Sequence, residues 1–328
     1  MTAGTAPRLE RLRHWYLRKA PRRLVQATAA GLARSRPLAT EPGWHFDAAA
    51  DDPHQLTQFR RDLWQYFRDH DIDKPVLYRW YEGLRVRLFL GNDLSLCLYA
   101  GGSFEPNEFA FLRAVLKPGM VFLDGGANDG LYSLYAARRV APGGRVLAIE
   151  PSTREFERLE ANLTLNRLSS VEALKLALGS ETGEATLAIA EPGHEGQNTI
   201  GARVSNPKVT TSAHETVPIE TIDGLVEQLE LDRLDFVKLD VEGSEVDALD
   251  SARAALARFR PIVLLEAEDE RLASQQRTKQ DLLRIVEEIG YELWVFDPQT
   301  SQLRPPRLPD EPEGNAVAAP ADWTPPPV

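Results

Sequence analysis

Val-Phe-Leu-Asp-Gly-Gly-Ala-Asn-Asp-Gly, at residues 121–130, decides the fold of this chain. An apolar strand ends in Asp124, and a glycine-rich turn follows it before a helix. The start of a helix presents backbone N–H groups to a ligand, and glycines let the backbone approach that ligand closely. This order of elements therefore predicts a cofactor site at the turn.

The charge of Asp124 narrows the choice of cofactor. In a dinucleotide-binding fold the same turn receives a pyrophosphate, which a carboxylate at the strand tip would repel. A ligand with positive charge would be attracted instead, and S-adenosylmethionine carries an ammonium and a sulfonium. An NAD-dependent oxidoreductase stays open as an alternative, because Gly125-x-Ala127-x-x-Gly130 approximates the dinucleotide-binding pattern.

A second carboxylate supports a nucleoside cofactor. Glu150 ends the next predicted strand, at residues 145–149, and Pro151 follows it. Its two oxygens can accept hydrogen bonds from both hydroxyls of a ribose that carries no 2′-phosphate. We therefore expect Glu150 to bind the ribose, and the alternative is a surface acid that begins the following helix.

More acids follow the predicted strand at residues 234–239. Asp240 and Glu242 would face the crevice at the carboxyl end of the sheet, where α/β proteins bind ligands. An acceptor hydroxyl that reacts there must lose its proton, and these two carboxylates are the leading candidates for the base. Glu266 and Glu268, after the next strand, could complete a carboxylate site for magnesium, although acids at such positions also serve caps and substrate contacts.

A long segment at residues 190–215 is rich in Gly, Asn, Pro and Thr. We expect this segment to be a loop that covers the substrate, because loops of this length in compact domains are often functional. His194 and His214 lie in it, and for each a solvated histidine is the simpler interpretation.

Apolar strands alternate with amphipathic helices over most of the chain. This pattern predicts an α/β fold, with a mostly parallel sheet of about seven strands and helices on both faces. The strands are expected at residues 120–124, 145–149, 171–176, 234–239 and 262–266, with two further candidates at 292–296 and 316–319. The helices are expected at residues 130–139, 153–166, 222–229, 244–257 and 277–289.

Additional elements precede this α/β pattern. We expect a helix at residues 54–69 and a β-hairpin, whose strands at 84–90 and 94–98 would be joined by a turn at Gly91-Asn92-Asp93. The predicted domains are a basic N-terminal arm at 1–50, the accessory helix and hairpin at 51–102, the cofactor-binding domain at 103–303 and a Pro-rich C-terminal segment at 304–328.

The composition limits the class of protein. With 328 residues, 43% hydrophobic and 27% charged, the chain resembles ordinary globular proteins. The single cysteine, Cys97, excludes an intrachain disulfide, and no run is apolar enough for a membrane span or a signal core, so we expect a cytoplasmic protein. A net charge of -11 argues against a nucleic-acid partner, because phosphate backbones need a broad basic surface.

The N-terminus differs in charge from the rest of the chain. Residues 1–36 carry nine Lys or Arg against one acid, Glu10. Apolar residues recur at helical spacing over residues 8–36, with Pro21 as an interruption. A weak contact with an anionic membrane surface is one interpretation of this arm, and the commoner one is a solvated or loosely packed terminus.

Taken in order, these motifs resemble the FkbM-type family of S-adenosylmethionine-dependent methyltransferases. The similarity spans roughly residues 95–296 and does not cover the basic arm. The matching residues are Gly102 to Glu108, Asp124-Gly-Gly-Ala-Asn-Asp-Gly130, Glu150-Pro151, then Phe156, Leu159, Asn162 and Asn166, Val217-Pro218 with Thr221 and Asp223, and Lys238-x-Asp240-x-Glu242-Gly243-x-Glu245.

The resemblance implies a Rossmann-like class I methyltransferase fold and methyl transfer from S-adenosylmethionine, in most members to an oxygen of a small molecule, sugar or glycan. It implies that Asp124, Gly126 and Asn128 hold the methionine end, Glu150 the ribose, and that Asp240 lies near the sulfonium. The full set of implied cofactor-binding residues is Asp124, Gly125, Gly126, Ala127, Asn128, Gly130, Glu150, Pro151 and Asp240, and the implied catalytic pair is Asp240 and Glu242.

Some features of the chain depart from the family pattern or stay open. Asp129 stands where members commonly have an aliphatic residue, and Ala177-Leu178-Gly179 offers no polar side chain that could read adenine. No metal ligand is assigned, and a divalent metal such as magnesium is not expected. Besides the oxidoreductase, a non-catalytic protein of the same fold with a membrane-docking arm remains as an alternative.

Overall fold

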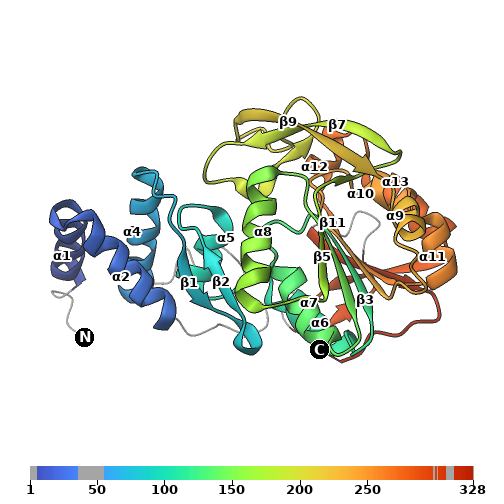
Figure 1. Ribbon diagram of the computed structural model, residues 1–328, viewed down its shortest axis with the longest axis horizontal. Coiled ribbons are helices and arrows are strands. Elements are labelled where there is room, and N and C mark those ends of the chain that lie inside the picture. Colours follow the sequence, from blue (N-terminus) through green and yellow to red (C-terminus); the bar gives the residue numbers. More distant parts are fainter. Residues whose placement is uncertain (1–5, 36–54, 298–299, 301, 308–313, 328) are drawn as a thin grey trace. The chain divides into compact units, whose positions relative to one another are not determined.

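The computed structural model describes residues 6–35, 55–297, 300, 302–307 and 314–327. The chain divides into two compact units, Met1–Pro106 and Asn107–Val328 (Figure 1). All of the predicted cofactor-binding and catalytic residues belong to the second unit. This unit therefore positions the candidate site.

The second unit is built on an eight-stranded sheet with the order β13-β12-β14-β11-β10-β3-β4-β5. Its strands are β3 (Val121–Gly125), β4 (Arg145–Ile149), β5 (Val171–Leu174), β10 (Phe236–Leu239), β11 (Ile262–Ala267), β12 (Tyr291–Phe296), β13 (Leu303–Arg304) and β14 (Gly314–Pro320). Strands β5, β4, β3, β10 and β11 are parallel, and β14 runs antiparallel between β11 and β12. The chain order reverses between β3 and β10, and such a switch point is where α/β sheets bind ligands.

Helices cover both faces of the sheet (Figure 1). Successive side chains of a strand point to opposite faces, so each strand contributes to the packing on both. On one face, the rings of Phe122 and Phe236 stack at 5.0 Å, and Phe111 of α6 lies 6.1 Å from Phe236. On the other face, Leu123 and Val237 belong to the main apolar core. The helices around the sheet are α6 (Pro106–Val115), α7 (Leu131–Val140), α8 (Thr153–Asn166), α9 (Ile222–Gln228), α10 (Glu245–Asp250), α11 (Arg253–Phe259), α12 (Asp269–Ser274) and α13 (Lys279–Glu288).

A second, four-stranded sheet has the order β6-β9-β7-β8. Its strands are β6 (Ala177–Leu178), β7 (Gly183–Ala190), β8 (Thr199–Ile200) and β9 (Thr211–Glu220). The expectation of one long loop at residues 190–215 was wrong, because β8 and the first part of β9 fall within it. Residues 209–219 are rich in Thr, Val and Ile, which favour strands, and they pair with β7.

The first unit combines helices with a short hairpin. Its helices are α1 (Ala6–Lys19), α2 (Arg22–Ser35), α4 (Gln55–Asp69) and α5 (Asp93–Ser95), which continues into the π-helix η2 (Leu96–Gly101). The hairpin pairs β1 (Val76–Arg79) with β2 (Arg85–Leu88). None of the helices in the described part of the chain is long and apolar enough to cross a membrane.

The second strand of the predicted hairpin was wrong. Residues 94–98 are helical, and the strand at residues 84–90 pairs with β1 instead. The reason is a capping box: the side chain of Asn92 accepts a hydrogen bond from the Ser95 N–H, and the Ser95 hydroxyl lies 3.2 Å from the Asn92 N–H. Asn followed by Ser three residues later begins a helix here rather than forming a hairpin turn.

The predicted fold class is confirmed. The sheet is mostly parallel, with helices on both faces, and the two-residue β13 makes it eight strands rather than about seven. The strand candidates at residues 292–296 and 316–319 are β12 and β14. The helix expected at residues 244–257 is instead two, α10 and α11, and the four-part domain division stays a prediction.

Candidate active site

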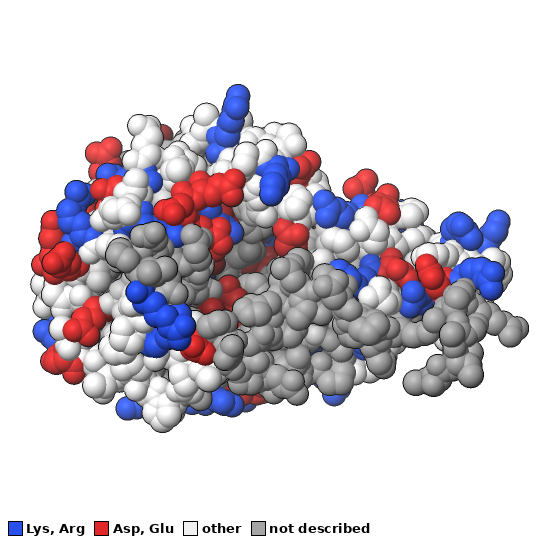
Figure 2. Space-filling model, turned by 180° about the vertical axis from the view of Figure 1, so that it is seen from behind, with Lys and Arg blue, Asp and Glu red and all other residues white. Residues whose placement is uncertain are grey.

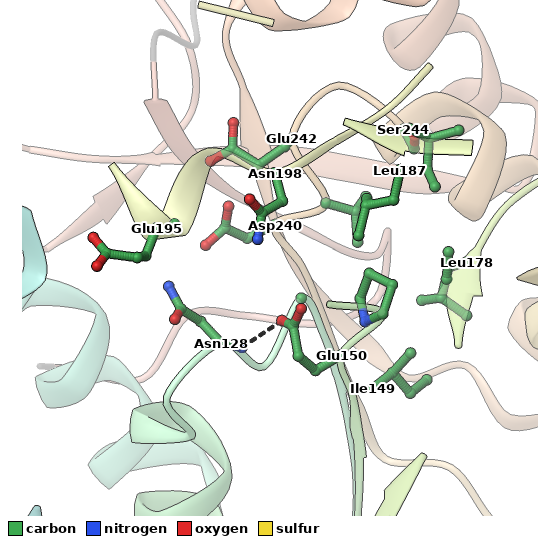
Figure 3. A pocket seen from close by; sticks show the side chains of 16 residues that line it. Asn128, Ile149, Glu150, Leu178, Leu187, Glu195, Asn198, Asp240, Glu242 and Ser244 are labelled. Carbon is green, nitrogen blue, oxygen red and sulfur yellow. Dashed lines mark hydrogen bonds between the residues drawn. The ribbon is translucent and has the colours of Figure 1, made fainter. Parts of the chain in front are cut away.

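A pocket opens at the switch point, at the carboxyl ends of β3 and β10 (Figure 3). It contains about 600 Å³ of empty space, including its open mouth, and small-molecule sites typically have several hundred cubic ångströms. The residues that line it are Gly126, Asn128, Ile149, Glu150, Pro151, Ala177, Leu178, Leu187, Glu195, Gly196, Asn198, Ile200, Asp240, Val241, Glu242 and Ser244.

The turn after β3 passes very close to the end of β10. Gly126 has a φ of 74°, and a Cβ at this position would lie 1.8 Å from the carbonyl oxygen of Asp240. Asn128 also has a positive φ, 49°, and its side-chain oxygen accepts a hydrogen bond from the Asp129 N–H at 2.8 Å. The close approach and the backbone conformation together require glycine at position 126.

The N–H groups of this turn are bonded within the protein. Gly126 and Ala127 both donate to the carbonyl oxygen of Ile149, at 3.0 and 2.9 Å. Asn128 donates to Oε2 of Glu150 at 2.9 Å. The expectation that the turn presents unpaired N–H groups was therefore wrong at these positions. A pyrophosphate needs such donors, and these three N–H groups are not available to it.

Glu150 lies in the wall of the pocket (Figure 3). Its Oε1 accepts a hydrogen bond from the Ser152 N–H at 2.9 Å, and its Oε2 accepts the one from Asn128. Burial raises the pKa of Glu150 to about 8, while the two backbone N–H groups favour the charged form. Each oxygen keeps a lone pair for a further donor, so the carboxylate can accept both hydroxyls of a ribose.

Asp124 is fully buried and does not line the pocket. Its Oδ2 accepts a hydrogen bond from the Ser133 hydroxyl at 2.5 Å, and its Oδ1 lies 3.6 Å from Nζ of Lys238. Burial raises the pKa of Asp124, and Lys238 opposes that effect. The two residues are neighbours because the register of β3 and β10 pairs them side by side. The predicted contact of Asp124 with the ammonium of the cofactor stays a prediction.

Lys238 connects the turn to Asp240, and the sequence analysis gave it no role. Its buried Nζ donates to the carbonyl oxygen of Gly126 at 3.0 Å and lies 3.1 Å from Oδ2 of Asp240. The ammonium also lies 4.8 Å from the centre of the Tyr132 ring. The sequence contains a signal for this role, because Lys238 lies within the buried strand Phe236–Leu239. An ionised side chain is rarely buried unless it has charged partners, so such a lysine predicts nearby carboxylates.

Arg271 of α12 contacts several carboxylates near the end of β10, on the side of the pocket opposite Glu150. Its guanidinium forms ion pairs with Oε2 of Glu242, with Oε2 of Glu266 at 3.3 Å and with Oε2 of Glu268 at 2.7 Å. It thus contacts three of the four carboxylates that were considered for a magnesium site. Within the residues that the structure describes, no group of three or more His, Cys, Asp or Glu could hold a metal ion.

Asp240 and Glu242 line the pocket but differ in their ionisation. Burial acts to raise the pKa of Asp240, but the positive charges of Lys238 and Arg271 outweigh it and the pKa is lowered. Burial raises the pKa of Glu242 to about 8, in spite of its ion pair with Arg271. The side chain of Asp240 is 34% exposed and that of Glu242 is 10% exposed. Asp240 is therefore the ionised carboxylate that is more open to a ligand.

The second sheet and its loop supply the rest of the pocket wall, and the sequence analysis missed these residues. Leu187 of β7 and Ile200 of β8 line the pocket together with Leu178. Leu187 and Leu178 lie at the same end of the pocket, which is therefore apolar (Figure 3). Asn198 donates to Glu155 of α8 at 3.1 Å, which fastens the loop to the main sheet's helices. A partial signal for this wall is the Thr, Val and Ile content of β9, although strand propensity does not show that β9 pairs with β7. Neither His194 nor His214 lines the pocket.

The predicted cofactor residues divide into two groups. Gly126, Asn128, Glu150, Pro151 and Asp240 line the pocket, whereas Asp124, Gly125, Ala127 and Gly130 do not. The two other glycines allow elements to pack closely: a Cβ would lie 2.8 Å from Leu178 at position 125 and 2.6 Å from Leu159 at position 130.

The strand order and the position of the pocket are those of a Rossmann-like class I methyltransferase. Residues 124–293 match the family model for the methyltransferase FkbM domain. Because this match covers more than half of the chain, the chain belongs to the FkbM methyltransferase family. The predicted family is thus confirmed.

Curated relatives match part of the chain. The AMB antimetabolite synthetase AmbE of Pseudomonas aeruginosa is 32% identical over 205 residues, which are 52% of this chain and 10% of that protein. Methyltransferase 1 of Beauveria bassiana is 32% identical over 142 residues, which are 39% of this chain and 56% of that protein. The chain therefore spans little more than half of the second relative and a tenth of the first. Among solved structures, methyltransferase FkbM from Methylobacillus flagellatus has 17% identity and a TM-score of 0.40, over 84% of this chain and 57% of that one.

Proposed function

We propose that this chain is an S-adenosylmethionine-dependent methyltransferase that methylates a hydroxyl oxygen of a small molecule, sugar or glycan. The observation that carries the proposal is one pocket in which Glu150, at the end of β4, and Asp240, at the end of β10, lie on either side of the glycine turn. Membership of the FkbM family supports the reaction class.

The pocket residues fit the parts of S-adenosylmethionine. We assign the ribose to Glu150, whose two oxygens each keep an unused lone pair. The apolar end of the pocket, with Leu178 and Leu187, suits the adenine ring, which stacks on apolar side chains without a specific hydrogen bond. The methionine end is assigned to Gly126 and Asn128. When bound, the cofactor supplies an electrophilic methyl group on a sulfonium.

Asp240 is the proposed base for the acceptor hydroxyl. With S-adenosylmethionine bound, the O–H proton would move to the Asp240 carboxylate while the oxygen forms its bond to the methyl carbon. The bond between that carbon and the sulfur would break, and S-adenosylhomocysteine would leave as the neutral thioether. Lys238 and Arg271 keep this carboxylate ionised, so it is ready to receive a proton at neutral pH. Glu242, which forms an ion pair with Arg271, is the second member of the proposed catalytic pair, and we assign it to binding the acceptor hydroxyl.

Calorimetry tests the cofactor part of this proposal. We expect S-adenosylmethionine and S-adenosylhomocysteine to bind, and NAD to bind at least about 100-fold more weakly, because the N–H groups of residues 126–128 already have partners within the protein and cannot bind a pyrophosphate. Tighter binding of NAD would overturn the methyltransferase assignment.

Transfer of a labelled methyl group to a panel of acceptors tests the chemistry. The panel should contain matched pairs in which a hydroxyl is replaced by hydrogen or by an amine. Label in the hydroxyl compounds alone supports O-methylation, and label in the amines alone would overturn it. Since no metal takes part in the proposed step, EDTA should leave turnover unchanged.

A further inference from the structure

Unit 1 carries an apolar surface that methyl transfer does not explain. Three exposed apolar residues lie on α1: Leu9, Leu12 and Trp15 are 44%, 57% and 56% exposed. Their spacing of three residues places them along one side of the helix. Within the described part of the chain, all large apolar side chains that are exposed belong to unit 1, and they are Leu9, Leu12, Trp15, Leu24, Leu56 and Leu77.

Other residues of α1 hold the helix in place within unit 1. The Tyr16 hydroxyl lies 2.7 Å from the Thr28 hydroxyl of α2, and the Tyr16 ring meets the ring of Phe59 of α4 edge-on at 6.0 Å. Arg13 forms an ion pair with Asp62 of α4 at 3.1 Å. The helix is therefore attached through Arg13 and Tyr16, and the exposed apolar side chains are not part of that attachment.

Basic side chains lie beside the exposed apolar ones and between them. Arg11, Arg18 and Lys19 are exposed on α1. At 3.6 residues per turn, Arg11 and Arg18 lie on one side of Trp15, and Lys19 lies on its other side. The one acid of α1, Glu10, points more than a quarter turn away from Trp15. Figure 2 shows Lys and Arg side chains at this end of unit 1.

We propose that this face of α1, made of Leu9, Arg11, Leu12, Trp15, Arg18 and Lys19, docks on the surface of an anionic lipid bilayer. Helices that lie in a membrane interface bury Leu and Trp at the headgroup boundary, while Lys and Arg attract anionic lipids. A nucleic acid is a poorer fit, because its phosphate backbone would leave the three exposed apolar side chains, Leu9, Leu12 and Trp15, in water. The helix rests on the bilayer and does not cross it, and docking does not depend on the cofactor pocket.

Sedimentation of the full chain with vesicles tests the proposal. One vesicle preparation contains phosphatidylcholine alone and the other contains equal parts of phosphatidylcholine and phosphatidylglycerol. We expect binding to the anionic vesicles and little binding to the neutral ones. Replacing two exposed apolar residues, in Leu12→Ser with Trp15→Ser, should weaken binding about ten-fold or more. The triple change of Arg11, Arg18 and Lys19 to Gln should weaken it by a similar factor.

Matched control variants test whether binding depends on this face of α1 or on exposed apolar side chains and positive charge in general. Leu56→Ser with Leu77→Ser removes two exposed apolar side chains of unit 1 that lie on α4 and β1. Changing Arg138, Arg203 and Lys208 to Gln removes three exposed cations of unit 2, and so the same amount of charge. Both controls should bind anionic vesicles as the unchanged protein does. Circular dichroism checks that every variant keeps its helices.

Three results would overturn the proposal. They are equal sedimentation with and without anionic lipid, binding that the Leu12 and Trp15 changes leave intact, and a loss of binding that is as large in the controls. If the chain binds no vesicles but self-associates, and Leu12→Ser with Trp15→Ser abolishes that association, the face is an interface between copies of the chain and the lipid proposal is wrong.

Discussion

The two sides of the pocket are held in shape by different interactions. On the cofactor side, the turn at residues 126–128 is fixed by backbone hydrogen bonds to Ile149 and by the contact of Asn128 with Glu150. On the acceptor side, Asp240 and Glu242 are held by ion pairs with Lys238 and Arg271. The first arrangement depends on backbone geometry, and the second depends on charge.

This difference predicts how each side responds to change. Backbone hydrogen bonds and a glycine conformation do not titrate, so the cofactor side should be sensitive to added atoms. When one partner of a buried ion pair is removed, the other is left as an uncompensated buried charge. The acceptor side should therefore be sensitive to a change in charge. Mutations that keep size or charge can therefore distinguish the two sides.

Gly126→Ala should have the largest effect. The added Cβ would lie 1.8 Å from the carbonyl oxygen of Asp240, so the turn must move away from β10. A displacement of this size at a binding site can cost about 100-fold, and we expect at least this loss in S-adenosylmethionine affinity by calorimetry. The control is Gly119→Ala, where φ is also positive, 85°, but no atom lies within 4 Å of the added Cβ. An unchanged affinity in Gly126→Ala would mean that the turn does not contact the cofactor.

Arg271→Met should lower turnover about 100-fold while the cofactor affinity stays within about three-fold. Without the guanidinium, Glu242 and Glu266 lose their cation, and the pKa of Asp240 rises. The acid limb of the pH profile of kcat/KM should therefore move to higher pH. Arg253→Met is the matched control, because Arg253 also bridges two carboxylates, but on the surface. If cofactor affinity falls as much as turnover, the two sides of the pocket are not independent.

Glu150→Gln should lower the affinity for both S-adenosylmethionine and S-adenosylhomocysteine about 30-fold. Glutamine offers one acceptor oxygen, and its NH₂ group would face one of the two backbone N–H donors that now bind Glu150. Glu220→Gln is the control, since Glu220 is also buried and accepts a backbone N–H, but does not line the pocket. Equal losses for both variants would show that the effect is one of stability and not of ribose binding.

The sequence predicted the cofactor side better than the acceptor side for a physical reason. The turn and Glu150 follow their strands directly, so apolar runs and glycines were enough to place them at one edge of the sheet. Arg271 is more distant in sequence from Asp240, on a helix after the next strand. Its local sequence indicates a pair with Glu268, three residues earlier, but not its contacts with Glu242 and Glu266. The pairing of Lys238 with Asp124 likewise depends on the register of β10 and β3, which strand patterns alone do not give.

The second sheet was missed for another reason. Gly, Asn and Pro between residues 191 and 207 suggested a loop, and the pairing of β7 with β9 joins residues up to 36 apart across that loop. Such pairing is set by tertiary packing and not by local propensity. The apolar end of the pocket contains Leu187 of this sheet. Because the sheet was not predicted, this end of the pocket was not predicted either.

Asp129 differs from Glu150, the other carboxyl group near the turn, because no hydrogen bond satisfies it. Its side chain is buried, neither of its oxygens has a hydrogen-bond partner, and burial raises its pKa to about 7. The unfolded chain loses this proton near pH 4, whereas the folded protein keeps it to about pH 7, so stability falls as the pH rises through this window. At pH 8 the free energy of unfolding is therefore about 4 kcal/mol lower than at a pH where both states keep the proton.

Asp129→Asn removes this pH dependence and should have the smallest effect on the pocket. We expect denaturant unfolding to show that the variant is stabilised relative to the unchanged protein, and that this gain is about 2.5 kcal/mol larger at pH 8 than at pH 5. Asp232→Asn, at an exposed position, should show no such difference between the two pH values. Cofactor affinity should stay within about three-fold, because Asp129 does not line the pocket. A gain that is equal at both pH values would mean that Asp129 is ionised in the folded protein, and a large loss of affinity would place it in contact with the cofactor.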